Sequence, residues 1–269
     1  MDVEISESEF AQFQHLMLDV AGIQLGSAKR TLVSSRLAGR LRKLGLPTYG
    51  EYFRLISGGT DAVERQTAVD LLTTNETYFF REPKHFDFLR ELLGRLRPTG
   101  QPFRVWSAAC SSGEEPYSIA MVLADRSLGR PWEILASDLS TRVLAKARLG
   151  HYPQSRASQI PAAYLKRFCL KGIGPEEGTL LVDEALTALV DFRMINLKEP
   201  FPEVGSFDVI FLRNVMFYFD GETKSSVTAR LTERLRPGGY LFIGHSETLN
   251  GTTRKLRAVG PAIYQKPLA

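Results

Sequence analysis

Cysteine is scarce in this sequence, and so are the features that would place the protein outside the reducing interior of a cell. Only Cys110 and Cys169 occur among 269 residues, and neither has a second Cys or a His at metal-ligand spacing. We therefore expect no disulfide framework and no metal centre. The chain has no apolar run of about 18 residues, and its acidic start lacks the basic and apolar stretches of a signal peptide. These absences predict a cytoplasmic protein without membrane insertion.

A large excess of either charge is also missing. The formal net charge is +4, with 24% charged and 43% hydrophobic residues, which is ordinary for a globular protein. The total charge therefore indicates no particular partner. A length of 269 residues allows one large domain or two unequal ones.

Residues 1–72 show helical spacing and no strand pattern. Apolar residues recur at intervals of three and four between positions 10 and 20, and further helices are expected at about 28–44, 48–56 and 62–72. Gly45 and Pro47 provide a stop signal for the helix at 28–44. We predict an all-α N-terminal domain at residues 1–72.

From residue 103 the pattern changes to alternating strands and helices. We expect strands at 103–108, 132–137, 189–195, 207–212, 240–244 and 262–265, and helices at 116–125, 140–149 and 221–235. Ser140 is expected to cap the second of these helices. The alternation predicts an α/β fold with a doubly wound parallel sheet over residues 73–269. Residues 161–188, with three glycines at 172–178, are expected to form a small antiparallel β insertion.

The turn after the first strand lacks the G-x-G of a dinucleotide site. It reads AACSSGEE over residues 108–115, so Glu114 and Glu115 stand at the start of the next helix and would repel a pyrophosphate. Asp138, at the end of the second strand, is placed to accept hydrogen bonds from a ribose diol. S-adenosylmethionine combines a ribose with a sulfonium and an ammonium group and carries no phosphate. It fits this combination, although the two acids could also serve only to favour the helix dipole.

Five ordered motifs resemble the CheR family, the chemotaxis receptor glutamate methyltransferases. They are TTNETYFFRE at 73–82, VWSAACSSGEEPYS at 105–118, ASD at 136–138, FLRNVMFYFD at 211–220 and GHSE at 244–247. The resemblance implies a Rossmann-like class I methyltransferase domain. It also implies methyl transfer from S-adenosylmethionine to glutamate side chains of chemoreceptors, which yields γ-methyl esters and S-adenosylhomocysteine in chemotaxis adaptation.

The resemblance also implies the residues of the cofactor site. Asn75, Thr77 and Arg81 are expected to close over the methionine end of the cofactor. Glu115 and Asp138 are expected to hold its ammonium side and its ribose. The walls around its adenine and methionine parts are expected to be lined by Asn196, Leu197, Arg213 and Asn214.

The chemistry requires no general base. A glutamate carboxylate has an ordinary pKa of about 4.3, so it is ionised at neutral pH and only needs to be aligned with the methyl group. Arg81 can present two N–H groups to a carboxylate, either of the substrate or of the cofactor. Tyr218 is the second catalytic candidate, because the resemblance outweighs the alternative of core packing between Phe217 and Phe219.

The helix predicted at 28–44 is strongly basic. Its period places Lys29, Arg36, Arg40 and Lys43 on one face, and we expect that face to point outward. Charge alone does not distinguish an acidic protein, a nucleic acid, a membrane surface or solvent as its partner. The resemblance favours the glutamate-bearing receptor helices, with Arg36, Arg40 and Arg42 as contacts.

The insertion at 161–188 is a candidate site for a receptor C-terminal peptide, which would add a strand and tether the enzyme near its substrate. Three other readings remain. A nicotinamide dehydrogenase would carry a G-x-G-x-x-G motif after the first strand, and this sequence does not have one. A nucleic-acid methyltransferase would carry a D/N-P-P-Y/F-like motif where residues 213–216 read RNVM. A non-catalytic S-adenosylmethionine-binding regulatory module is the main alternative, and the intact site residues favour the enzyme over it.

Overall fold

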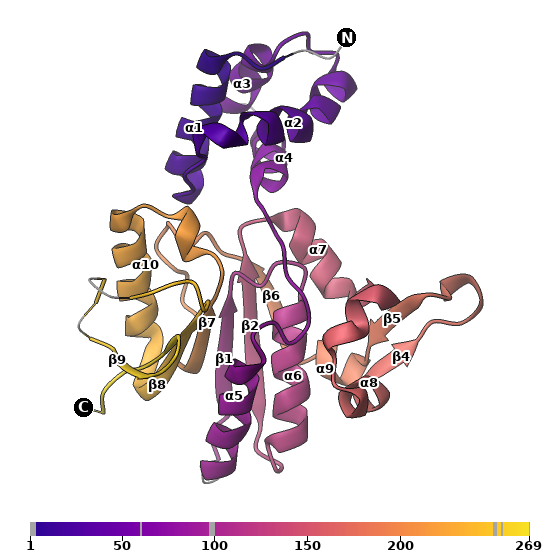
Figure 1. The fold of residues 1–269 in the computed structure, drawn as a ribbon, viewed down its shortest axis with the longest axis vertical. Helices are drawn as coiled ribbons and strands as arrows, with labels where there is room; N and C mark the ends of the chain where they lie inside the picture. The colour runs from indigo at the N-terminus through magenta and orange to yellow at the C-terminus, as the bar shows by residue number, and fades with distance from the viewer. Residues whose placement is uncertain (1–3, 60, 97–99, 250–251, 254, 269) are drawn as a thin grey trace. The chain divides into compact units, whose positions relative to one another are not determined.

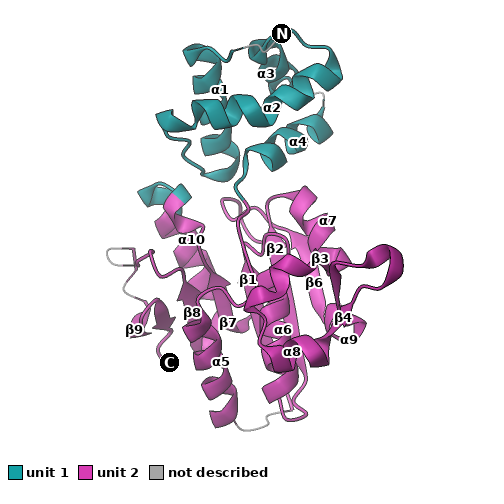
Figure 2. Ribbon diagram, turned by 45° about the vertical axis from the view of Figure 1, so that its right-hand side comes forward, with its two compact units in different colours: residues 1–74, 218–223 teal, residues 75–217, 224–269 magenta. Residues whose placement is uncertain are grey.

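A computed structural model describes residues 4–59, 61–96, 100–249, 252–253 and 255–268. The chain divides into two compact units (Figure 2). The first contains residues 1–74 and 218–223, and the second contains 75–217 and 224–269. The predicted boundary at residue 72 therefore lies close to the end of the first stretch, but a short segment around Tyr218 belongs to the N-terminal unit as well.

The N-terminal unit is helical. Its longer helices pack through fully buried side chains such as Phe13, Leu37 and Tyr52. Ser6 starts the first helix with a capping box. Its hydroxyl accepts from Glu9 N, and its own main-chain N–H donates to the Glu9 carboxylate. The elements are α1 (Glu7–Ala21), η1 (Ser27–Lys29), α2 (Arg30–Leu44), α3 (Tyr49–Ser57) and α4 (Ala62–Leu72).

The basic face of α2 does not point outward as a whole, which corrects the sequence expectation. Arg36 donates to the main-chain oxygens of Leu72 and Thr73 at 3.1 and 2.9 Å. Arg40 forms a two-point ion pair with the buried Glu64, which also accepts from Tyr52. Glu64 is only 5% exposed, so its carboxylate needs this partner. The helical period did not reveal that α4 supplies an acid beneath α2.

The second unit is built on a seven-stranded sheet with the order β6-β2-β1-β7-β8-β10-β9 (Figure 1). The five strands from β6 to β8 run parallel to one another. β10 pairs antiparallel with both of its neighbours, β8 and β9. Val105 and Trp106 of β1 point to opposite faces, and both are fully buried, so both faces of the sheet are covered. The strands are β1 (Phe103–Ala108), β2 (Trp132–Asp138), β6 (Val190–Met194), β7 (Phe207–Leu212), β8 (Leu235–Ile243), β9 (Arg257–Gly260) and β10 (Ile263–Gln265).

The helix α5 (Pro83–Arg95) precedes β1, and the helices α6 (Glu114–Arg126), α7 (Thr141–Leu149) and α10 (Gly221–Arg234) follow β1, β2 and β7. The sequence analysis left α5 unassigned, although Pro83 at its start and the buried Phe86, Leu89 and Leu93 follow a helical pattern. α5 packs along α6 and presents its first turn to the site.

A small second sheet has the order β3-β5-β4. It lies to one side of the main sheet in Figure 1. It differs from the insertion predicted at 161–188, because its strand β3 (His151–Pro153) precedes that range and α8 (Ala162–Phe168) is helical. The remaining elements are η2 (Gln154–Gln159), β4 (Cys169–Lys171), η3 (Gly174–Glu176), β5 (Thr179–Val182) and α9 (Glu184–Thr187).

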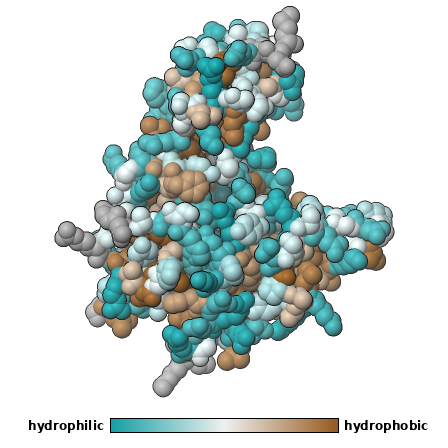
Figure 3. Space-filling model, in the orientation of Figure 1, coloured by the Kyte–Doolittle hydropathy of each residue, from teal (hydrophilic) through white to brown (hydrophobic). Residues whose placement is uncertain are grey.

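The β4 edge of this small sheet is unpaired in the strand order. Leu170 and Ile173 next to it are 57% and 80% exposed, and Figure 3 shows hydrophobic patches on this lobe. Among the helices of the described residues, none combines the length and apolarity required to cross a membrane.

Candidate cofactor site

Polar side chains gather where β1 and its neighbours end. The strand order reverses between β1 and β7, and ligands of doubly wound sheets bind outside the carboxyl ends of the strands at such a point. Ser107 lies at the end of β1, Asp138 at the end of β2 and Arg213 directly after β7. Asn196 and Leu197 follow β6. Of these positions, the sequence predicted Asp138, Arg213, Asn196 and Leu197 as site residues.

The turn after β1 is tight and requires small residues. Ala109 and Ser111 have positive φ angles of 135° and 49°, and Gly113 has 97°. A Cβ atom on Gly113 would lie 2.7 Å from the Tyr152 hydroxyl and 2.9 Å from the Ala147 Cβ. Non-glycine residues in such conformations cost about 1–3 kcal/mol each and persist where the surroundings enforce them.

Asp138 enforces part of this geometry. One carboxylate oxygen accepts from Ser111 N and the other from Ser140 N, both at 2.9 Å. The Ser111 hydroxyl in turn donates to the Asn75 main-chain oxygen at 2.8 Å. The expected side-chain cap from Ser140 is wrong, since its hydroxyl makes no capping bond to α7. Asp138 binds the amide of Ser140 instead, so one acid links the turn to the entry of α7.

A buried guanidinium lies between two carboxylates. Arg213 Nη1 is 2.7 Å from Glu115 Oε2, and its Nη2 is 3.1 Å from Glu82 Oε2. The Arg213 side chain is 2% exposed, and the two acids are each 12% exposed. Glu115 also accepts from the Ser107 hydroxyl at 2.6 Å. Two carboxylates around one guanidinium leave a net negative charge, which favours a cationic ligand.

Glu82 holds the loops after β7 and β8 together. Its Oε1 accepts from Asn214 Nδ2 at 3.3 Å and from His245 N at 3.2 Å. Burial by itself raises the pKa of Glu82, but the positive charge of Arg213 and these hydrogen bonds bring it below its ordinary value. Burial, reinforced by Arg213, lowers the pKa of the neighbouring His85 to about 3. The site therefore contains an ionised acid beside a neutral imidazole.

The two acids at the start of α6 have different environments. Glu114 is 1% exposed, accepts from the Ser112 hydroxyl and faces Arg156 at 3.4 Å, and burial raises its pKa. It is part of the interior and does not join the Arg213 cluster. Of the two acids, Glu115 belongs to the Arg213 cluster and stays the candidate for contact with a cationic ligand.

Glu247 was overlooked, although it lies within the GHSE motif. Its Oε1 accepts from Val215 N and Met216 N at 2.9 and 2.7 Å. Its Oε2 accepts from Asn214 N and Gly244 N at 3.0 and 2.7 Å. One carboxylate thus binds four main-chain amides and determines the conformation of the loop that follows Arg213, where Asn214 has a φ of 57°.

The segment that leads into α5 brings Asn75, Thr77 and Arg81 into the same unit. Arg81 Nη1 donates to the Glu76 main-chain oxygen at 3.0 Å, and its guanidinium lies 5.6 Å from the centre of the Tyr78 ring. The Arg81 main-chain oxygen accepts from Arg213. Thr77 is buried, and its main-chain oxygen accepts from Arg156 Nη1.

The remaining predicted residues occupy separate positions. Asn196 accepts from Lys198 N through its side chain at 3.0 Å, and Leu197 is buried. Tyr218 belongs to the N-terminal unit, where its main-chain oxygen accepts from Gln24 N at 2.8 Å. Hydrogen bonds and ion pairs therefore join Asn75 to the turn held by Asp138, and Arg81, Glu115 and Asn214 to the cluster around Arg213, whereas Tyr218 is held by different contacts.

The residues present fit S-adenosylmethionine. The turn of small residues allows close approach, Asp138 is an acid at the end of β2, and the Glu82–Arg213–Glu115 cluster carries a net negative charge toward a cationic ligand. A doubly wound sheet with such a site defines an S-adenosylmethionine-dependent methyltransferase. The predicted fold class and cofactor are confirmed by the comparisons that follow.

The chain belongs to the CheR methyltransferase family. Residues 75–264 match the family described as "CheR methyltransferase, SAM binding domain", and residues 8–73 match "CheR methyltransferase, all-alpha domain". The resemblance seen in the five motifs is thereby confirmed.

Similar proteins extend over nearly the whole chain. Chemotaxis protein methyltransferase 2 of Pseudomonas aeruginosa is 44% identical over 96% of this chain and 93% of its own length. Chemotaxis protein methyltransferase of Escherichia coli is 41% identical over 97% and 91%, respectively. The corresponding protein of Borreliella burgdorferi is 37% identical over 99% and 96%.

Glu247→Gln should weaken cofactor binding, because an amide nitrogen cannot accept the two N–H bonds that one carboxylate oxygen now receives. We expect the free energy of unfolding to fall by about 1–3 kcal/mol and the Kd for S-adenosylmethionine to rise about tenfold. Calorimetric titration and thermal unfolding measure the two effects. Glu177→Gln, at an exposed position in the second unit, serves as the control. An unchanged Kd in Glu247→Gln would show that the loop does not depend on this carboxylate.

Proposed function

We propose that the protein methylates specific glutamate side chains in the cytoplasmic helices of chemoreceptors. S-adenosylmethionine supplies the methyl group. A bond forms between the methyl carbon and a carboxylate oxygen as the bond from that carbon to sulfur breaks, leaving a γ-methyl ester and S-adenosylhomocysteine. The single observation that carries this proposal is the full-length similarity to chemotaxis protein methyltransferases, which covers both units.

The chemistry of the site supports an acceptor that is already anionic. The Arg213 guanidinium is committed to Glu82 and Glu115, and His85 is neutral and buried, so none of these groups is suited to removing a proton from a substrate. A glutamate with an ordinary pKa of about 4.3 requires no such step at neutral pH. Catalysis then consists of alignment and exclusion of water.

We assign the alignment to Arg81 and Tyr218. Arg81 is half-buried, its main-chain oxygen is bound by Arg213, and its guanidinium retains N–H groups for a carboxylate. Tyr218 follows Asn214 by four residues, in the motif that resembles the family's catalytic segment. A phenol hydroxyl is suited to orienting an acceptor oxygen.

Arg81→Ala and Tyr218→Phe should each lower methyl transfer by about 10²-fold or more while the protein stays folded. Transfer is measured as base-labile label after incubation with labelled S-adenosylmethionine and candidate receptors. Arg95→Ala, at an exposed position of the second unit, is the matched control. Normal turnover in both test variants would remove the two residues from the mechanism. Cofactor binding without any transfer by the unaltered protein would favour a regulatory module.

For receptor docking we propose the exposed end of α2. Of the three arginines expected there, Arg36 and Arg40 have internal partners, whereas Arg42 is exposed and adjoins the exposed Lys43. Receptor segments that display several glutamates are complementary to this pair of cations. Arg36 binds main-chain oxygens at the end of α4, and Arg40 binds Glu64 within α4. Both side chains would therefore fix the conformation of the docking surface in addition to contributing positive charge.

Arg42→Glu should raise the KM for receptor about threefold to tenfold and leave cofactor affinity unchanged, with a smaller effect at high salt. Arg65→Glu, an equal charge change at an exposed position of α4, is the control. Arg40→Glu should instead destabilise the N-terminal unit, because it places a second carboxylate beside Glu64. A loss of cofactor binding in Arg42→Glu would contradict a docking role.

The β4 edge is our candidate for a receptor C-terminal peptide. Its main-chain groups stand at the end of the small sheet, beside the exposed Leu170 and Ile173. A peptide strand could pair with this edge and cover both side chains, as in other cases of strand addition.

Calorimetric titration with peptides that copy receptor C-termini should show one site per chain, and Ile173→Asp should weaken it at least about tenfold by placing a charge under the added strand. Val63→Asp, at a similarly exposed apolar position of the N-terminal unit, is the control. Absence of heat with every peptide would exclude the tether.

A further inference from the structure

Glu82, His85 and His245 form a cluster for which the sequence offered no signal. Glu82 and His85 are three residues apart at the start of α5 and therefore share one side of the helix, while His245 comes from the loop after β8. One potential ligand atom of each residue lies within 4.8 Å of the others. His85 Nδ1 is 3.4 Å and His245 Nε2 is 3.8 Å from Glu82 Oε2.

These separations suit a small divalent cation. Zinc binds nitrogen and oxygen ligands at about 2.0–2.2 Å in a tetrahedral arrangement, which places ligand atoms about 3.4 Å apart. The Glu82–His85 distance already has this value, and His245 is half-exposed, so its ring can turn toward the same point. Two imidazoles and one carboxylate are also the ligand types of open metal sites that keep a position for water.

The buried imidazole supplies a second, independent observation. His85 is 0% exposed, and among the described residues neither of its ring nitrogens has a hydrogen-bond partner of good geometry, although the main chain of Pro261 lies nearby. Buried polar atoms are rarely left in this state. The His85 Nδ1 faces a carboxylate oxygen across 3.4 Å, a gap in which a cation would satisfy both groups.

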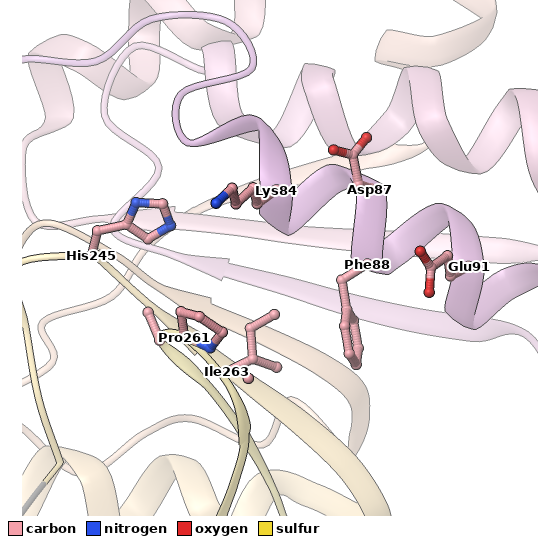
Figure 4. Close-up of a pocket in the computed structure, with 9 residues that line it drawn as sticks. Lys84, Asp87, Phe88, Glu91, His245, Pro261 and Ile263 are labelled. Atoms are coloured by element: carbon pink, nitrogen blue, oxygen red, sulfur yellow. The ribbon is translucent and has the colours of Figure 1, made fainter.

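The cluster is reachable from the surface. His245 borders a cavity of about 400 Å³ whose walls include Asp87, Glu91, Phe88 and Ile263 (Figure 4). The Lys84 side chain extends toward His245 in the same view. Asp87 and Glu91 are paired with Arg90 and Arg95 at 2.5 and 2.9 Å, so the cavity provides a path to His245 without an excess of negative charge.

We propose that Glu82, His85 and His245 bind a first-row divalent cation of the Zn²⁺ or Co²⁺ type. Glu82 Oε2 also contacts Arg213 at 3.1 Å, and Lys84 adds a second positive charge close by. Both charges oppose the ion, so the site is exchangeable and differs from the tightly held zinc of a folding module. This proposal departs from the expectation of no metal centre that cysteine and histidine spacing gave.

The proposal is tested on the full chain after removal of metals with a chelator. Titration with ZnCl₂ should show one site per chain with a Kd of about 1–10 µM, and Co²⁺ should give the visible absorption of a low-coordinate nitrogen and oxygen site. His245→Ala should weaken binding at least about tenfold and abolish the Co²⁺ spectrum. His245 is exposed, so this variant should retain its fold, which thermal unfolding checks.

His151→Ala is the matched control, since His151 is 40% exposed compared with 42% for His245 and also lies 3.4 Å from a glutamate oxygen. It should bind as the unaltered protein does. No binding tighter than about 100 µM, or equal binding by His245→Ala and the unaltered protein, would overturn the proposal. Methyl transfer is not the readout, so failure of this test and failure of the proposed function are distinguishable.

Discussion

The ion pairs of Arg213 with Glu82 and Glu115 are the interaction on which the site depends. They join the helix after β1, the loop after β7 and the start of α5, three segments far apart in the sequence. All three side chains are largely buried, so loss of Arg213 would leave two carboxylates without their cation, at a cost of about 3–5 kcal/mol. The same pairs leave a negative balance at the sheet edge. One arrangement therefore both stabilises the cofactor site and makes it attractive to a cationic ligand.

Main-chain geometry at this edge is maintained by carboxylates. Asp138 binds one amide in the turn that follows β1 and one at the entry of α7, and Glu247 binds four amides around the loop that follows β7. Ala109, Ser111 and Asn214, which have positive φ angles, all lie in these two segments. A charged acceptor makes stronger hydrogen bonds than a neutral one, so it can hold conformations that these residues seldom adopt. The acids that the sequence suggests as ligand-binding groups are thus also structural.

The candidate cofactor-site residues and the proposed receptor contacts lie in different units of the chain, and the catalytic candidate Tyr218 lies in the same unit as the receptor contacts. The second unit contains the cofactor-site residues from Asn75 to Asn214, and the N-terminal unit contains α2 and the segment with Tyr218. The proposed acceptor, a glutamate carboxylate, is ionised at neutral pH, so the proposed reaction needs no proton relay. Within α2, Arg40 is paired internally with Glu64, whereas Arg42 is exposed and belongs to the proposed docking surface.

The sequence by itself determined the five parallel strands of the main sheet and the identity of the cofactor. Val105 and Trp106 belong to a strand that its apolar run predicts without tertiary structure. Asp138 and Arg213 stand where two further apolar runs end in a charged residue. Local periodicity could not show the three-residue strands β3 and β4, which are too short to carry a pattern, nor the α5 helix that was left unassigned. It also placed Arg40 outward, because helical spacing does not reveal an acid on another helix. The partners of Arg213, the four amides of Glu247 and the approach of His245 to His85 were decided only by the tertiary structure, since each joins residues brought together by sheet topology and not by spacing along the chain.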